Sequence, residues 1–281
     1  MTSAPFATLI HGPSVLNRPN DISVRFVYWL LAASCLVFCG CTSPRSSQEQ
    51  AGQLTDANVL RVGVTPNMPP MIFKQSGQVT GLEAELARQL ASSLGKTVRF
   101  VEMPWDEQID ALLAGRTDII MSNLSITPSR SMRIDFSRPY LRSGQAALVR
   151  RSEAAALRLG LFSAKCRIGV QRATTGDYYV QADLSRAKRA YYATPTAGAE
   201  GLIDKRIDVF IHDAPVNWWL ASENEAKGLT VIPALLTQEF LAWGVRKDSH
   251  GLLDAANRFL EQAGQNGQLQ AAINRWIPRW N

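Results

Sequence analysis

The chain has 281 residues, of which 46% are hydrophobic and 19% are charged, and its formal net charge is +6 at pH 7. This composition is typical of a globular protein and excludes disordered and collagen-like chains. The length allows one or two domains with sizeable cores. Basic residues are scattered and form only short groups such as Arg150-Arg151, so we expect no nucleic-acid partner.

The four cysteines are unevenly placed along the chain. Cys35, Cys39 and Cys41 lie close together near the N-terminus, whereas Cys166 stands alone. This spacing fits neither a disulfide framework nor a zinc site, and we expect no metal and no other cofactor. Cys166 lies in an apolar stretch, which favours a buried thiol over a reactive one.

An uncharged apolar run extends from Phe26 to Cys39 and follows Arg18 and Arg25. Its length of about fourteen residues is short of the roughly twenty that a membrane-spanning helix needs. It fits the apolar core of a secretory signal instead. We therefore expect residues 1–40 to be a signal peptide.

Gly40-Cys41 follows this run, and a polar stretch comes next. A small residue directly before a cysteine at this place resembles the bacterial lipoprotein signal. The resemblance implies that Cys41 is acylated, becomes the first residue of the mature chain and anchors it to a membrane. Residues 41–57, which are rich in Ser, Gln and Thr, then read as a flexible tether.

The signal departs from this pattern in two respects. Phe38 and Cys39 stand where lipoproteins prefer Leu and a small residue, and the segment before the apolar run is long. A true start at Val24 would explain the length, and an uncleaved signal anchor is the alternative. Both readings place the globular part outside the cytoplasm, in the periplasm or cell envelope.

After the tether, short apolar runs alternate with amphipathic segments. Leu82, Leu86, Leu90 and Leu94 place one apolar face on a helix, which Gly95 ends. The predicted strands are 59–64, 97–102, 118–121, 166–170, 189–192 and 208–211, and the predicted helices are 82–94, 107–114, 176–184 and 197–203. This alternation predicts an α/β fold with mostly parallel sheets flanked by helices.

A local repeat indicates two similar halves. The sequence ALLAGRTDII at 111–120 resembles GLIDKRIDVF at 201–210, since each joins a helix end, a basic turn, an Asp and a strand. We interpret this as two α/β lobes whose strand ends face a shared cleft, and chance recurrence of a common turn is the alternative. Glu83 and Glu85 lie off the leucine stripe and are expected to be solvated.

The segment 122–140, SNLSITPSRSMRIDFSRPY, follows a predicted strand. Ser122, Asn123 and Ser125 supply hydroxyl and amide groups, and Arg130 offers a planar fork that matches a carboxylate. The segment therefore predicts a carboxylate receptor. A solvated surface arginine is the alternative for Arg130.

An ordered set of motifs now identifies a family. The motifs are RVGVTPNMPP (61–70), GLEAELARQLASSLG (81–95), DIIMSNLSITPSR (118–130), DFSRPY (135–140), IGVQRATTGDYY (168–179), VFIHDAPVNWWL (209–220), LAWGVRKDS (241–249) and GQLQAAINRW (267–276). In this order, from Val59 to Trp276, they closely resemble the family 3 extracellular solute-binding proteins. The resemblance implies the two-lobed periplasmic-binding-protein type II fold with a hinge.

The resemblance also implies a function and a division into lobes. Lobe 1 would comprise residues 58–149 and 237–281, and lobe 2 residues 150–236. The protein would be a monomeric binding protein without catalytic residues. It would capture a small polar ligand, an L-amino acid, between its lobes and present it to the permease of an ABC importer.

Carried over position by position, the resemblance assigns nine ligand-binding residues. Arg130 would bind the ligand carboxylate, and Asp213 would pair with the ligand ammonium group. The other positions are Ser122, Asn123 and Ser125 at the carboxylate and ammonium, Thr174 and Thr175 at the start of a second-lobe helix, and Met68 and Trp105 on the pocket wall. Two alternatives stay open: Asp213 caps the helix that follows it, and Trp105 is simple core.

Departures from the family pattern bear on the ligand and on the alternatives. Thr65 replaces the aspartate of receptors for basic amino acids, and Met68 replaces a frequent aromatic residue. These replacements favour a ligand with a neutral or acidic side chain. Ala173 replaces a usual glycine, which is expected to tighten the carboxylate loop.

Two other functions are compatible with the same fold. One is a cyclohexadienyl dehydratase-like enzyme, although Asp177 stands where such enzymes carry a longer carboxylate. The other is an envelope module that senses a ligand. His212, at the end of a predicted strand, is expected to be structural.

Overall fold

A computed structural model describes residues 58–160 and 166–277 of the chain. The predicted signal peptide, Cys41 and the tether lie outside these residues. Within them, no helix has both the length and the apolar character that crossing a membrane requires.

The first of two large sheets has the strand order β5-β1-β6-β15-β7. Its strands are β1 (Val59–Val64), β5 (Thr97–Glu102), β6 (Ile119–Ile120), β7 (Asp135–Phe136) and β15 (Gly244–Val245). Strand β1 is parallel to β5 and β6, whereas β15 is antiparallel to β6 and β7. The other four strands therefore run in one direction, as expected of a mostly parallel sheet.

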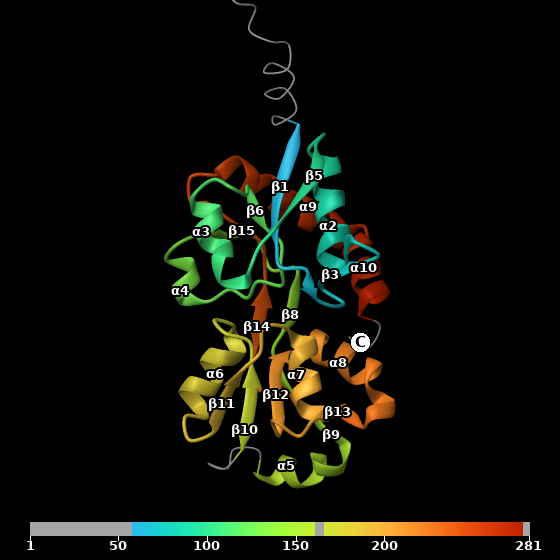
Figure 1. The fold of residues 1–281 in the computed structure, drawn as a ribbon. Coiled ribbons are helices and arrows are strands. Elements are labelled where there is room, and N and C mark those ends of the chain that lie inside the picture. The colour runs from blue at the N-terminus through green and yellow to red at the C-terminus, as the bar shows by residue number, and fades with distance from the viewer. Residues whose placement is uncertain (1–57, 161–165, 278–281) are drawn as a thin grey trace, which may run out of the picture. The chain divides into compact units, whose positions relative to one another are not determined.

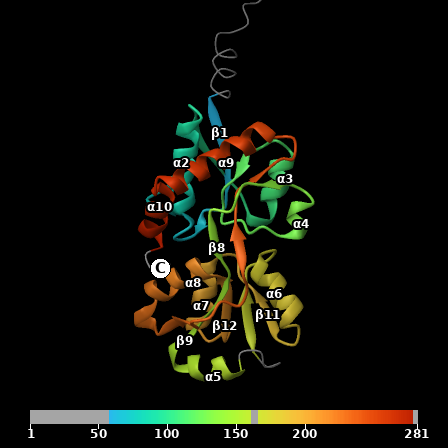
Figure 2. The ribbon, with the colours of Figure 1, turned by 180° about the vertical axis from the view of Figure 1, so that it is seen from behind.

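Helices and a small sheet accompany the first large sheet. They are α2 (Leu82–Ser93), α3 (Gln108–Leu113), α4 (Pro128–Ser131), α9 (His250–Gln265), α10 (Gln268–Trp276), the 3₁₀ turn η1 (Trp105–Glu107) and the strands β2 (Asn67–Met68), β3 (Ile72–Gln75) and β4 (Gln78–Thr80). Figure 2 shows α9 crossing in front of the sheet. We call these elements the first lobe.

The second sheet has the order β11-β10-β12-β9-β13. The second lobe contains β9 (Gln145–Arg150), β10 (Arg167–Val170), β11 (Lys188–Tyr191), β12 (Val209–Asp213) and β13 (Leu229–Val231), with α5 (Ala154–Gly160), α6 (Thr175–Asp183), α7 (Pro195–Ile203), α8 (Ala214–Glu223), η2 (Arg151–Glu153) and η3 (Glu225–Lys227). Here β9 is the antiparallel strand, as β15 is in the first sheet. The two sheets thus share one topology.

Two strands, β8 (Leu141–Ser143) and β14 (Glu239–Leu241), pair antiparallel and connect the lobes. Figure 1 shows both between the first and second lobes. Strand β8 leads into β9 of the second sheet, and β14 leads into β15 of the first. Because β9 pairs with β12 and β13, residues 145–149 belong to the second sheet, although the sequence-based division assigns them to lobe 1.

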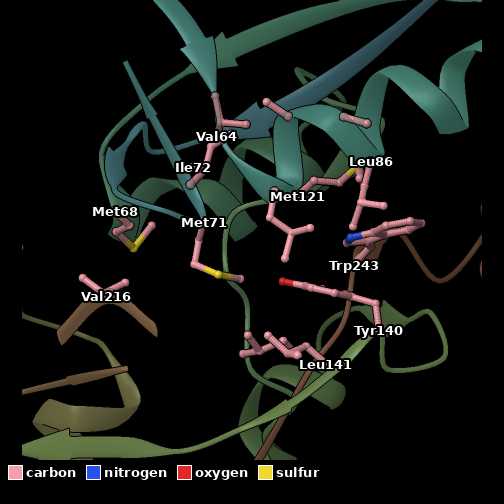
Figure 3. Close-up of a cluster of buried hydrophobic side chains, with 14 of the residues drawn as sticks. Val64, Met68, Met71, Ile72, Leu86, Met121, Tyr140, Leu141, Val216 and Trp243 are labelled. Carbon is pink, nitrogen blue, oxygen red and sulfur yellow. The ribbon is translucent and has the colours of Figure 1, made fainter. Parts of the chain in front are cut away.

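The predicted alternation of strands and helices is confirmed, with shifts of one or two residues at the ends of the elements. On α2, Leu82, Leu86 and Leu90 are fully buried, because the leucine stripe faces the first sheet. Figure 3 shows part of the core beside this helix, where Met71, Met121 and Trp243 come together.

The repeat seen in the sequence corresponds to the same set of Asp–Arg hydrogen bonds in each of the two large sheets. In the first sheet, Asp118 accepts hydrogen bonds from the backbone N–H of Arg61 at 2.9 Å and from its guanidinium at 2.5 and 3.1 Å. In the second sheet, Asp208 accepts the same three bonds from Arg167 at 2.9, 2.6 and 3.2 Å. The turn after α3 and the turn after α7 therefore lock their strands in the same way.

The expectation that Glu83 is solvated is wrong. Its side chain is fully buried, and Oε1 accepts hydrogen bonds from the Tyr140 hydroxyl and the backbone N–H of Asn123. The first turn of α2 packs under the loop that follows β6, so this side of the helix is covered as well. Glu85 is partly buried and accepts bonds from Arg275 and Trp276 of α10.

Candidate functional site

The loop after β6 carries the first group of predicted site residues. Asn123 adopts a left-handed conformation with φ of 58°, and its N–H donates to Glu83 Oε1 at 3.0 Å. Thr127 begins α4 by accepting a bond from the backbone N–H of Arg130 at 3.3 Å. Glu83 and the Thr127 cap therefore fix where the side chains of Asn123 and Arg130 point.

Arg130 lies at the contact between the two lobes and is only 8% exposed. Its guanidinium donates to the carbonyl oxygens of Ser125 at 2.8 Å and Ala173 at 3.5 Å, and it lies 5.3 Å from the centre of the Trp105 ring. Burial lowers the pKa of Arg130, but a guanidinium stays protonated at neutral pH. Within residues 58–160 and 166–277, no carboxylate forms an ion pair with it.

Trp105 and Ala173 complete the surroundings of Arg130. The Trp105 indole Nε1 donates to the Ala173 carbonyl oxygen at 3.0 Å. This carbonyl of the second lobe therefore accepts hydrogen bonds from two side chains of the first lobe, Trp105 and Arg130. Ala173 has φ of 60°, a left-handed conformation that glycine adopts more readily. Trp105 therefore packs against the core and also contacts the second lobe through its polar edge.

Asp213 of β12 points toward the first lobe. Its two carboxyl oxygens accept hydrogen bonds from Asn123 Nδ2 at 3.0 Å and from Gln145 Nε2 at 2.9 Å. It makes no side-chain cap bond to α8, in contrast to the alternative considered from the sequence. Burial raises the pKa of Asp213 to about 8, Glu239 adds to the rise, and Arg130 opposes it.

His212 is buried and structural, as expected. Its Nδ1 accepts the backbone N–H of Asp213 at 2.8 Å, which places the ring proton on Nε2, 3.2 Å from the side-chain oxygen of Gln171. Burial lowers the pKa of His212 to about 4, so the ring is neutral at physiological pH. The 3.3 Å approach of His212 to the Asp213 carboxyl is therefore not an ion pair.

The two predicted threonines have different partners. Thr174 caps α6, since its hydroxyl oxygen accepts the Asp177 N–H at 3.3 Å. Thr175 donates instead to Glu239 Oε2 at 2.9 Å, and Ser125 donates to the same oxygen at 2.5 Å. The sequence reasoning missed Glu239, because it lies outside the motifs that carry the family resemblance.

Two predicted residues face away from this polar cluster. The fully buried hydroxyl of Ser122 accepts bonds from the Thr65 backbone N–H at 2.9 Å and from Gln108 Nε2 at 2.8 Å, inside the first lobe. Met68 belongs to an apolar cluster that also contains Val216 of α8, as Figure 3 shows. The structure therefore unites Asn123, Ser125, Arg130, Trp105, Thr175 and Asp213, with Thr174 in a supporting role.

A pocket of about 240 Å³ opens on the Arg130 side of this cluster. It is lined by Trp105, Asp106, Gln108, Ile109, Leu124, Ser129, Arg130, Arg133, Ala173 and Tyr178. Asn123 and Asp213 do not border it, and their side chains bond to each other across the lobes. Among residues 58–160 and 166–277, no group of three or more His, Cys, Asp or Glu is placed to hold a metal ion.

Comparison with known proteins decides the family. Residues 60–279 match the model of the bacterial extracellular solute-binding proteins, family 3. The chain belongs to this family. The type II periplasmic-binding-protein fold of this solute-binding protein agrees with its structural neighbours. One of them is the crystal structure of the ancestral amino acid-binding protein AncCDT-1, a precursor of cyclohexadienyl dehydratase, which is 31% identical with a TM-score of 0.73. The match covers 81% of this chain and 99% of that one.

Curated relatives of this solute-binding protein include binding proteins and an enzyme. The L-cystine-binding protein TcyJ of Escherichia coli K12 is 25% identical over 226 residues, covering 80% of this chain and 85% of TcyJ. The cyclohexadienyl dehydratase of Pseudomonas aeruginosa is 25% identical over 269 residues, covering 91% of this chain and 96% of the enzyme.

Proposed function

We propose that this solute-binding protein captures an L-amino acid between its lobes and presents it to an ABC importer. An α-amino acid carries a carboxylate and an ammonium group a short distance apart. The cluster offers a cation, Arg130, on the first lobe and a carboxyl group, Asp213, on the second. A ligand that bridges the two would contact both only when the lobes are together, so its binding would favour closure.

The observation that carries the proposal is that the guanidinium of Arg130 is buried without a carboxylate partner among the described residues. A buried guanidinium needs compensation for lost hydration, and carbonyl oxygens and an aromatic face supply it only in part. A ligand carboxylate would provide the missing counter-charge with two parallel hydrogen bonds. The names of the relatives TcyJ and AncCDT-1, a cystine-binding and an amino acid-binding protein, support a ligand of this class.

We infer that the protein is a binding protein and not a dehydratase. The candidate acid in the second lobe, Asp177, accepts the backbone N–H of Ala173 at 3.1 Å and lies 3.1 Å from the Arg189 guanidinium. It is 5% exposed and bound within its own lobe, which disfavours proton transfer to a ligand in the cleft. Incubation with prephenate should produce no phenylpyruvate absorbance.

We also propose that Cys41 is lipidated, so that the mature protein is anchored in the periplasm or cell envelope. The tether 41–57 would then separate the anchor from the lobes. Support comes from the Gly40-Cys41 pair after an apolar run and from relatives named as periplasmic or extracellular. Metabolic labelling with a palmitate analogue should mark the wild-type protein and not Cys41→Ser.

Thermal unfolding with each of the common L-amino acids tests the ligand proposal. Binding to the native state should raise the melting temperature by mass action. Arg130→Ala should abolish the rise while the protein stays folded by circular dichroism. Arg138→Ala is the matched control, since Arg138 lies in the same segment but is 62% exposed, and it should keep the rise. Ligand binding retained by Arg130→Ala would remove Arg130 from the site.

A further inference from the structure

Glu239 of β14 is a carboxylate at the junction of the two lobes, to which no ligand-binding role is assigned above. Its Oε2 accepts hydrogen bonds from Ser125 of the first lobe at 2.5 Å and from Thr175 of the second at 2.9 Å. Its Oε1 accepts a third bond from Thr237 at 2.8 Å. One carboxylate oxygen of Glu239 therefore accepts a hydrogen bond from a hydroxyl group of each lobe.

This arrangement changes what the two hydroxyls can offer a ligand. A serine or threonine hydroxyl has one hydrogen and two lone pairs, and a carboxylate only accepts. Ser125 and Thr175 direct their hydrogens at Glu239, and Thr175 also accepts a bond from Gln145 at 3.0 Å. They therefore do not serve as the carboxylate donors that the family resemblance implies. Their remaining lone pairs suit the N–H groups of a ligand.

The charges around the cluster also disfavour a ligand carboxylate beside Ser125 and Thr175. Glu239 lies close enough to Asp213 to raise its pKa, and both carboxyl groups act on Arg130 from the same region. Within the cluster, one guanidinium is thus set against two carboxyl groups, and the second guanidinium that lines the pocket, Arg133, pairs with Asp110. A ligand's α-carboxylate has Arg130 as its partner, whereas a second carboxylate would meet the hydroxyl pair that already holds an anion. Glu239 is partly buried, and a second carboxylate close to it would be repelled by its like charge.

We propose that Glu239 is a specificity-determining residue that excludes ligands with a second carboxylate, so that the cleft accepts amino acids with uncharged or cationic side chains. The inference rests on the proposed function, because it assumes an amino acid in this cleft. It departs from the expectation drawn from Thr65 and Met68, which favours neutral or acidic side chains, and the two agree only on uncharged side chains.

Isosteric pairs of ligands test this proposal. The probes are L-glutamine with L-glutamate and L-asparagine with L-aspartate, and L-arginine serves as the cationic member. Dissociation constants are measured by calorimetry for the wild type, Glu239→Gln and Glu239→Asp. We expect the wild type to bind at least one uncharged or cationic probe and to disfavour each acidic one. Glu239→Gln should raise affinity for the acid relative to its amide at least tenfold, and Glu239→Asp should keep the wild-type preference.

Three results would contradict the role of Glu239, and they differ in what they say about the proposed function. Equal binding of an acid and its amide by the wild type would overturn the role of Glu239 and leave the proposed function intact. An unchanged acid-to-amide ratio in Glu239→Gln would do the same. If the wild type binds none of the five probes, the proposal for Glu239 fails, whereas the proposed function fails only if the thermal screen finds no L-amino acid that binds. Glu102→Gln is the control, because Glu102 is an exposed carboxylate of β5 that pairs with Lys74, and it should leave the ratio unchanged.

Discussion

Glu83 offers the sharpest test of the structure, because it is a fully buried acid that the sequence marks as a surface residue. Burial raises the pKa of Glu83 to about 7, although the Tyr140 hydroxyl and the Asn123 N–H lower it in part. In the unfolded chain, the pKa of Glu83 returns to its ordinary value of 4.5. The folded protein therefore holds a proton that the unfolded chain releases across this range.

The difference in the pKa of Glu83 between the folded and unfolded states makes the free energy of unfolding depend on pH. The folded-state pKa lies above the unfolded one, so the contribution of Glu83 is fully present below pH 4.5 and is lost as pH rises through about 7. A difference of about 2.5 pKa units, at about 1.4 kcal/mol per unit, gives roughly 3 kcal/mol. For a domain of this size, that corresponds to roughly 6–12 °C in melting temperature.

Glu83→Gln keeps the shape of the side chain and removes the titrating group. Urea unfolding of both proteins from about pH 4 to pH 9 should show the variant gaining roughly 3 kcal/mol relative to the wild type as pH rises. Taking the difference between the two proteins cancels groups that they share, such as Asp213. Parallel stability curves over the whole range would refute the assignment of Glu83 as a buried acid.

Two further predictions concern the cleft. Since the pKa of Asp213 is about 8, binding of a ligand ammonium group should release a proton near pH 7, and affinity should fall by up to about tenfold per unit as pH drops below 8. Calorimetry in two buffers of different ionisation enthalpy measures this release, and its absence in the wild type would contradict the pairing of Asp213 with the ammonium group. Ala173→Gly should stabilise the fold by up to about 1 kcal/mol, because the left-handed conformation at φ 60° costs alanine more than glycine. An unfolding free energy lowered by this substitution would contradict the strain.

Much of the fold was accessible from the sequence because its signals are local. The leucine stripe of α2, the glycine after it and the repeated Asp-containing turn each act within a few residues. Such patterns predict helices, strands and even the shared topology of the lobes. They do not reveal that residues 145–149 pair with the second sheet, since an apolar run is equally compatible with either lobe.

The candidate site was predicted in part, for a related reason. Arg130 and Asp213 were proposed from residue type and family position, and in the structure Asn123, from the loop that carries Arg130, donates to Asp213. Glu83 and Glu239 were missed because their environment depends on chain far away in sequence: Glu83 lies against Tyr140, and Glu239 contacts Ser125 and Thr175. Local sequence patterns do not show such contacts between distant parts of the chain.

The position of β15 has a consequence for how the protein is made. This strand sits between β6 and β7 in the first sheet, yet it comes from residues 244–245, near the end of the chain. The ribosome must therefore complete almost the whole chain before the N-terminal lobe can close its sheet. A nascent chain with this strand order cannot complete its first sheet until synthesis is nearly finished.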